Sequence, residues 1–378
     1  MRRSLAGLSM VLVLGACAGE DTPTSSSLDA ASFKVADAGV AGAVYLVSND
    51  ASSNTILVYP RRADGSLGDP SAVATGGQGT GGGLGKQAAL VLDHNGRFLY
   101  AVNAGSNTIS AFRITGQGMT LLGTVPSGGT EPISVALGGN LLYVLNDGGT
   151  ANVTGFRVGP DGTLDMIAGS SRALSTAAPD AAQVGISPDG RHLLVTEKAT
   201  NLLVGWDING DGTLGHRTLT PSASPTPFGF AFDKRGTALV SEAVGGAADA
   251  SVLSSYRFGG AGLVAISPSS ATTETAACWV AVTPNGRFAY VTNAGSATVS
   301  GFAVGRTGAL RLLDADGATG ATAATPLDAG ISRNGRFLYT LDAGGQAISA
   351  FRIASDGSLT HLGDIPGLPA GATGLVSD

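Results

Sequence analysis

Two glutamates lie at the ends of apolar segments, where their carboxylates could act on water. Glu197 and Glu242 each come six or seven residues after a turn glycine. The matching positions of other segments hold Asn or Asp: Asn103, Asn146, Asn293 and Asp342. Asn and Asp cap tight turns by bonding backbone N–H groups, whereas glutamate is less typical there and can accept a proton from water. We therefore predict Glu197 and Glu242 as catalytic bases, with turn capping as the alternative.

A second group combines acidic, amide and aromatic side chains near the starts of other apolar segments. Its members are Glu131, Asp180, Gln183, Phe228, Trp279 and Asp328. An aromatic ring can stack on a sugar, and a ring beside a carboxylate can bind a cationic ligand. Packing of the rings in the core is the alternative. We predict this group as substrate-binding, with Lys86 and Lys198 as the nearest cations in the sequence.

Other chemistries find little support. The histidines fall outside this group, at His94, His192, His216 and His361. The stretch from Gly77 to Gly82 matches a dinucleotide fingerprint, but no helix is expected after it. The acidic turn that begins at Asp207 has Thr218 where a calcium loop needs a bidentate glutamate. We therefore expect no histidine-based site, no metal and no cofactor.

The candidate residues are distributed over repeats of one pattern. Asn-Gly-Arg-Phe followed by one residue and Tyr occurs at 95–100, 285–290 and 334–339. From Tyr45 to Tyr339 the chain completes six periods of about 49 residues, each with four apolar segments separated by turn signals. Four strands in a unit of this length are typical of a propeller blade. We predict an all-β, seven-bladed β-propeller with four antiparallel strands per blade; a pair of β-sandwiches, the alternative, does not explain one uniform period.

The two ends of the repeat region complement each other. The first repeat begins at its second strand, at Val44, and the segment 370–376 resembles the start of the repeat at Asp328. We predict that the C-terminal strand completes the first blade and leaves no open sheet edge. In this topology the candidate site residues lie around the upper channel mouth, opposite the Asn-Gly turns.

Composition and charge exclude several classes. The chain has 378 residues, 58 of them glycine, with 13% charged residues and a formal net charge of −6. It carries no basic footprint for nucleic acid, so we expect no nucleic-acid partner. Charge is too sparse for a disordered polyelectrolyte or a coiled coil. The glycines fit many short strands joined by tight turns.

The first residues have the pattern of an export signal. Arg2 and Arg3 precede a short apolar run that ends in Leu-Gly-Ala-Cys at 14–17. This ending resembles the bacterial lipobox, which implies cleavage after residue 16 and lipidation of Cys17; an ordinary signal peptide is the alternative. We predict a signal peptide over 1–16, a flexible tether over 17–40 and the propeller over 41–378. The protein is expected in the cell envelope, held by its lipid alone at the outer membrane, on the periplasmic or surface side.

The repeats resemble the lactonase family of seven-bladed propellers, which includes bacterial 6-phosphogluconolactonases and carboxymuconate cyclases. Tyr-Val-Thr-Asn at 290–293 is the signature of related surface propellers. The resemblance implies lactone chemistry with an Arg-His pair before one inner strand and a glutamate after the next strand. Here Phe228 and Gly229 stand in the Arg-His positions, and Glu242 matches the glutamate.

Two functions follow from these patterns. The first is a lactonase-like hydrolase or isomerase that acts on a small lactone or sugar acid at the upper channel mouth. The second is a non-catalytic propeller, displayed at the surface, that binds a glycan, a peptide or a protein partner. In either case we expect a monomer.

Overall fold

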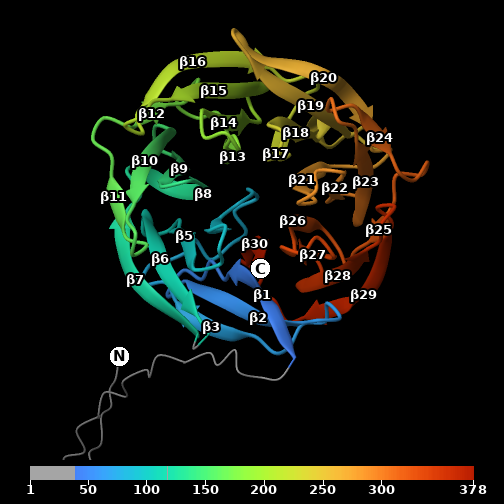
Figure 1. Cartoon of the computed structure of the whole chain (residues 1–378), viewed down its shortest axis with the longest axis horizontal. Helices are drawn as coiled ribbons and strands as arrows, with labels where there is room; N and C mark the ends of the chain where they lie inside the picture. Colours follow the sequence, from blue (N-terminus) through green and yellow to red (C-terminus); the bar gives the residue numbers. More distant parts are fainter. Residues whose placement is uncertain (1–38, 117) are drawn as a thin grey trace, which may run out of the picture. The chain divides into compact units, whose positions relative to one another are not determined.

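The computed structural model describes residues 39–116 and 118–378, and in that part the all-β prediction is confirmed. Seven small antiparallel sheets follow one another around a ring (Figure 1). The predictions for the signal peptide, Cys17 and most of the tether fall on residues that lie outside the described part. Within the described residues, no helix has the length and apolar character that crossing a membrane requires.

Each blade is described from its innermost strand outward. The first four blades are β30 (Thr373–Ser377), β1 (Val40–Val47), β2 (Thr55–Arg62) and β3 (Ser71–Ala74); β4 (Leu90–Leu92), β5 (Phe98–Asn103), β6 (Thr108–Thr115) and β7 (Gly118–Pro126); β8 (Thr130–Gly138), β9 (Leu141–Gly148), β10 (Asn152–Val158) and the outer pieces β11 (Leu164–Met166) and β12 (Arg172–Ala173); β13 (Ala181–Ile186), β14 (His192–Glu197), β15 (Leu202–Ile208) and β16 (Leu214–Pro221).

The last three blades follow the same order. They are β17 (Pro227–Phe232), β18 (Thr237–Glu242), β19 (Val252–Gly259) and β20 (Gly262–Ala271); β21 (Ala277–Val282), β22 (Phe288–Asn293), β23 (Thr298–Val304) and the outer pieces β24 (Leu310–Leu312) and β25 (Gly320–Ala321); β26 (Pro326–Ile331), β27 (Phe337–Asp342), β28 (Ala347–Ile353) and β29 (Leu359–Pro366). One short 3-10 turn, η1 (Val244–Gly246), follows β18.

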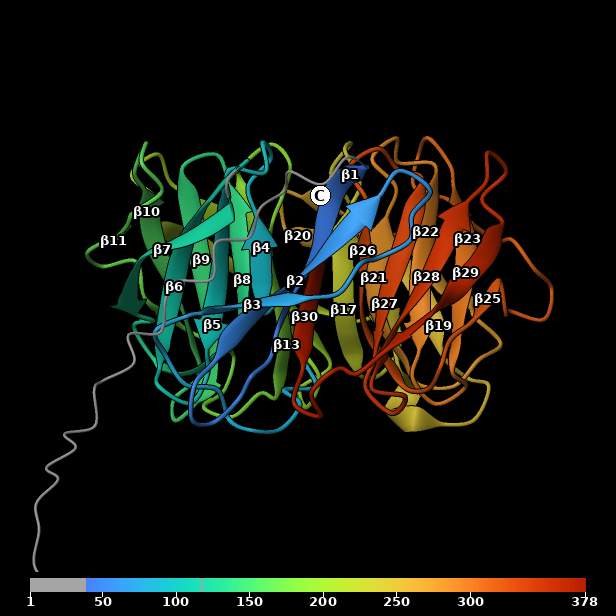
Figure 2. The same ribbon diagram turned by 90° about the horizontal axis from the view of Figure 1, so that it is seen from below.

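The ring closes in the first blade, as the sequence predicts. β30 pairs antiparallel with β1, so that Tyr45 lies opposite Val376 and Leu46 opposite Leu375. The Asp378 N–H donates to the Ala43 carbonyl at 2.9 Å, and the side view places β30 beside β1 (Figure 2). The innermost position of the first blade is therefore filled from the other end of the chain.

The second strand of each blade is the most deeply buried. Every residue of β5, β18, β22 and β27 is buried. Because each sheet is covered on both faces by neighbouring blades, these strands are buried on both faces and consist mainly of apolar residues, with polar residues concentrated near their ends. The core is thus divided among the interfaces between blades.

A repeated hydrogen bond crosses four of these interfaces. The hydroxyls of Tyr100, Tyr143, Tyr290 and Tyr339 each donate to a glycine carbonyl in the next blade, at 2.7–3.1 Å. The acceptors are Gly162, Gly212, Gly357 and Gly65, which turn the outer hairpins with φ between 85° and 96°. Only glycine adopts this conformation without strain. The repeated tyrosine and the Asp-Gly turn signal are therefore two ends of one contact.

Because β30 closes the ring, we expect a cavity between β30 and β1 to lower the stability of the whole protein. Leu375 is 3% exposed in the β30–β1 interface, whereas Leu362 in β29 is 37% exposed. We expect Leu375→Ala to lower the free energy of unfolding by about 3 kcal/mol, because it removes buried methyl groups and leaves a cavity. Leu362→Ala, the matched control, should change it by less than about 0.5 kcal/mol. Urea unfolding measures both, and equal midpoints for the two variants would contradict the closure argument.

Candidate functional site

The upper channel mouth is occupied by the chain itself. Residues 75–89 connect β3 to β4, and this connection, teal in Figure 1, reaches into the centre of the ring. The Val135 N–H of β8 donates to the Ala88 carbonyl at 2.8 Å, and the Gln87 N–H donates to the Ala182 carbonyl of β13 at 3.2 Å. The Gln87 amide also donates to the Val280 carbonyl of β21 at 3.2 Å. The connection thus joins the third, fourth and sixth blades.

Lys86 fixes the connection through ionic contacts. Its Nζ lies 3.0 Å from Asp147 Oδ2 and 2.5 Å from Asp180 Oδ1, and donates to the Ala181 carbonyl at 2.7 Å. Burial alone would lower the pKa of Lys86, but the two carboxylates raise it above its usual value. Lys86 therefore stays charged and holds the third and fourth blades to the connection.

Lys198 is the second cation at the mouth. Its Nζ lies 3.1 Å from Asp180 Oδ1 and 4.5 Å from the centre of the Phe228 ring. Burial and then the charge of Lys86 lower the pKa of Lys198, and Asp180 only partly offsets them. Burial would raise the pKa of Asp180, but the two lysines hold it below its usual value. Asp180 keeps a side-chain exposure of 54%, so it is the solvent-facing acid of this cluster.

The aromatic pair lies next to this cluster. Phe228 and Trp279 have ring centres 5.1 Å apart, tilted by 55°. Trp279 is 1% exposed and Phe228 is half-buried, so the tryptophan belongs to the core and only Phe228 borders solvent. The predicted substrate-binding roles of Phe228 and Trp279 stay predictions, and the geometry gives Phe228 the more accessible position.

Gly229 is one of the two positions where the resemblance implies an Arg-His pair, and it has no room for a side chain. A Cβ on Gly229 would overlap with Gln87 Oε1 and lie 2.7 Å from the Cys278 carbonyl. The 75–89 connection therefore occupies the space that a side chain would need at this position. Gln183, another predicted binding residue, accepts the Phe230 N–H at 2.6 Å and is 8% exposed, so its oxygen supports β17.

The remaining predicted binding residues lie apart from the cluster. Glu131 is exposed, and its backbone N–H donates to Asn107 Oδ1 at 2.7 Å. Asp328 is 2% exposed and lines a cavity in the channel together with Gln87. Burial raises the pKa of Asp328 to about 8, against the opposing effect of backbone N–H groups.

The two predicted catalytic bases are fully buried and occupied. Glu197 accepts hydrogen bonds from the backbone and hydroxyl of Ser175 and from the hydroxyl of Thr200. Glu242 accepts from the hydroxyls of Ser222, Ser254 and Tyr256 and from the Ser224 N–H. Burial raises the pKa of Glu242 despite these bonds. Each glutamate ties the connection before its blade to the blade itself; a catalytic role for either stays a prediction.

Asp147 is a member of the site that the sequence analysis missed. It follows Asn146 of the turn series, and its Oδ1 accepts the Ala181 N–H at 2.9 Å. The sequence does show a carboxylate directly after a turn position. Its ionic partner Lys86, however, lies 61 residues away, in a segment that has no strand pattern. Among the described residues, no three His, Cys, Asp or Glu side chains converge as metal ligands.

The chain belongs to the lactonase family of seven-bladed β-propellers. The family's profile matches residues 41–171, 151–245 and 251–372, which together cover most of the chain. A search of curated protein sequences gave no match.

Several solved structures have the same fold. A candidate 6-phosphogluconolactonase from Bacteroides fragilis is 20% identical, with 89% of this chain and 98% of that chain covered and a TM-score of 0.66. The periplasmic gluconolactonase of Pseudomonas aeruginosa is 18% identical, with 88% and 98% covered and a TM-score of 0.70. A Lactobacillus plantarum protein is 17% identical, with 89% and 99% covered and a TM-score of 0.71. At these identities the likeness concerns the fold.

Loss of the Lys86 cation should destabilise the mouth. Lys86→Met leaves Asp147, whose side chain is 14% exposed, without its countercharge. We expect the free energy of unfolding to fall by about 3 kcal/mol, the low end for breaking a buried ion pair. Lys234→Met, on an exposed turn at the other end of the blades, should change it by less than about 0.5 kcal/mol. Similar urea midpoints for the two variants would show that the connection is held without Lys86.

Asp328 should make stability depend on pH. A carboxyl with a raised pKa in the folded state binds its proton more tightly than in the unfolded chain. Stability is therefore greatest below the unfolded pKa of about 4 and falls as pH rises to about 8. Asp328→Asn should remove this contribution, so its Tm relative to the unaltered protein should rise between pH 5 and pH 9. Asp165→Asn, at an exposed position, should follow the unaltered protein; a parallel course for Asp328→Asn would refute the assignment.

Proposed function

We propose that the protein is a hydrolase that opens a small, hydroxyl-bearing lactone at the upper channel mouth. The observation that carries this proposal is Asp180, a half-exposed carboxylate held between two lysines directly before β13. Membership of the lactonase family and the names of two structural neighbours, a gluconolactonase and a candidate 6-phosphogluconolactonase, support this class of substrate.

Lys198 supplies the electrostatic part of the mechanism. Addition of water to the acyl carbon places negative charge on the carbonyl oxygen of the lactone, and a fixed cation in a partly dry site stabilises that charge. Lys198 has a 13% exposed side chain held between Asp180 and the Phe228 ring. Its ammonium is therefore oriented before the substrate arrives, and the Phe228 ring can cover one face of the sugar.

Asp180 supplies the proton transfer. Its exposed carboxylate orients a water molecule and accepts a proton as the water oxygen bonds to the acyl carbon. The acyl carbon–ring oxygen bond then breaks, and the proton moves to the ring oxygen as it becomes a hydroxyl. The product is the open hydroxy acid, with one water added and no other reactant.

The test is lactone opening by the full-length chain. We expect it to open glucono-δ-lactone faster than buffer in a pH-stat, near pH 6.5, where the spontaneous rate is low. Asp180→Asn and Lys198→Met should each lower kcat/KM by about 100-fold or more. Lys234→Met and Asp165→Asn, at exposed positions elsewhere, should retain the full rate.

The same assay separates the two candidate sets of bases. If Glu197→Gln and Glu242→Gln abolish turnover in folded protein while Asp180→Asn does not, the buried glutamates carry the chemistry. A rate equal to that of buffer for the unaltered protein would overturn the hydrolase.

One observation favours the non-catalytic alternative. Gln87 fills the space over Gly229 where the family pattern places a reactive side chain. A propeller without turnover would use Phe228 and the surrounding charges to bind a glycan or a peptide. Binding on a glycan or peptide array that Phe228→Ala removes, together with no lactone opening, would establish this alternative.

A further inference from the structure

A second chemical environment lies in the channel beyond the 75–89 connection. A cavity of about 360 Å³ runs along the innermost strands of three adjacent blades, β26, β30 and β4. It extends from Asp328 to the exposed turns that carry His94 and Arg333. Its walls between these ends are mainly apolar: Leu90, Leu92, Ile331 and Val376.

Asp328 is an unusual group for such a wall. It is 2% exposed, and its Oδ2 makes no hydrogen bond. Its other oxygen accepts the Ala329 N–H at 2.8 Å, and the backbone N–H groups of Ala88 and Leu375 also act to lower the pKa of this carboxyl. Burial of an unpaired carboxyl oxygen is costly, and most buried polar atoms have a partner. An open acceptor that lines a cavity therefore points to a ligand with donors.

A second unpartnered atom lines the same cavity. Ser377 Oγ is buried without a hydrogen-bond partner. Ser377 belongs to β30, which packs beside β26; a Cβ on Gly330 would lie 3.3 Å from the Ser377 nitrogen. The two open polar atoms thus come from neighbouring strands and lie at successive levels of the channel wall.

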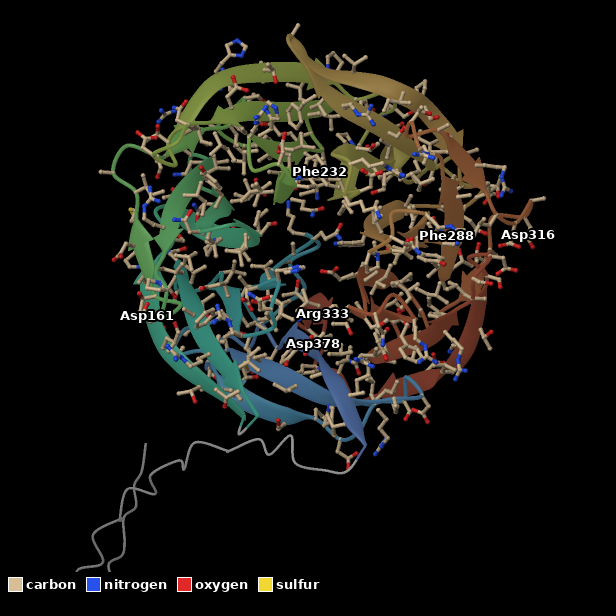
Figure 3. The ribbon with its side chains drawn as sticks, in the orientation of Figure 1. Asp161, Phe232, Phe288, Asp316, Arg333 and Asp378 are labelled. Atoms are coloured by element: carbon tan, nitrogen blue, oxygen red, sulfur yellow. The ribbon has the colours of Figure 1, made fainter. Side chains whose placement is uncertain are left out.

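The charges at the exposed end are already compensated. Arg333 Nη2 lies 2.9 Å from Asp378 Oδ1, and Figure 3 shows the pair near the centre of the ring. Asp93 Oδ1 accepts the N–H groups of Arg97 and Phe98. Of the acids that line the described cavity, Asp328 alone has a buried carboxylate oxygen without a hydrogen-bond partner.

We propose that this cavity binds a small primary ammonium compound that carries a hydroxyl group. The ammonium pairs with Asp328 Oδ2, and the hydroxyl bonds Ser377 Oγ. An ammonium offers three donors and fits an apolar channel that ends in an acid, because its aliphatic stem contacts the walls. The ligand enters from the exposed turns, so the site is separate from the upper mouth and independent of the proposed hydrolase.

Binding is coupled to proton release. Since the pKa of Asp328 is about 8, the ammonium must displace one proton from the carboxyl at neutral pH. Affinity should therefore rise about tenfold per pH unit below pH 8 and then level off. The other titratable groups that line the cavity, Asp93, His94 and Arg333, lie at its exposed end.

The experiment is isothermal titration calorimetry of the full-length chain with 4-amino-1-butanol. The matched ligand is 1,4-butanediol, which has the same length and lacks the ammonium. We expect the amino alcohol to bind at least tenfold more tightly than the diol. Titrations in two buffers of different ionisation enthalpy should show release of about one proton at pH 6.5.

Variants identify the site. Asp328→Asn should weaken binding of the amino alcohol at least tenfold and remove the proton release, and Ser377→Val should weaken it several-fold. Asp342→Asn is the matched control, because Asp342 is equally buried in the same blade but is bonded by Ser349 and Thr340 and does not line the cavity. Equal affinities for the two ligands, unchanged binding by Asp328→Asn, or no binding in the millimolar range would overturn the proposal.

Discussion

The structure depends on the fact that no four-stranded sheet of this chain can bury both of its faces alone. The second strands carry apolar side chains on both faces, so each blade needs a neighbour on either face. At four of the interfaces, a tyrosine-to-glycine hydrogen bond joins the neighbouring blades and also satisfies a buried hydroxyl. A ring provides two neighbours for every blade only when it is closed. The β30–β1 pairing is therefore a condition for the whole fold.

The 75–89 connection divides the channel into two different environments. On one side, Lys86, Lys198 and Asp180 form a charged cluster that borders solvent. On the other, Asp328 ends a cavity with mainly apolar walls. Two aspartates therefore have opposite pKa shifts: the pKa of Asp180 is lowered and that of Asp328 is raised. At Asp180 the positive charges of Lys86 and Lys198 lower the pKa, whereas at Asp328 burial without a nearby cation raises it.

The sequence predicts the fold well because its signals are local and periodic. Turn glycines, strand alternation and the spacing of tyrosines recur in each repeat, so the blade number and the closing strand follow from them. The candidate site is predicted less completely. The sequence names Asp180 and Phe228, which both contact Lys198, but their role stays a prediction. It does not reveal Asp147, since the path of a glycine-rich connection has no period that shows its contacts. Glu197 and Glu242 were distinguished by residue type, whereas their hydrogen bonds to Ser175 and Ser222 depend on connections between blades.

The closing strand also has a consequence for biosynthesis. β30 meets β1 across more than 300 residues, so six complete blades must leave the ribosome before the first blade has its inner strand. Until then the inner edge of β1 presents unpaired backbone groups, which can pair with any other exposed strand. A translational pause late in the chain would leave that edge open for longer. The risk of misassembly during synthesis is therefore concentrated at one strand, made first and completed last.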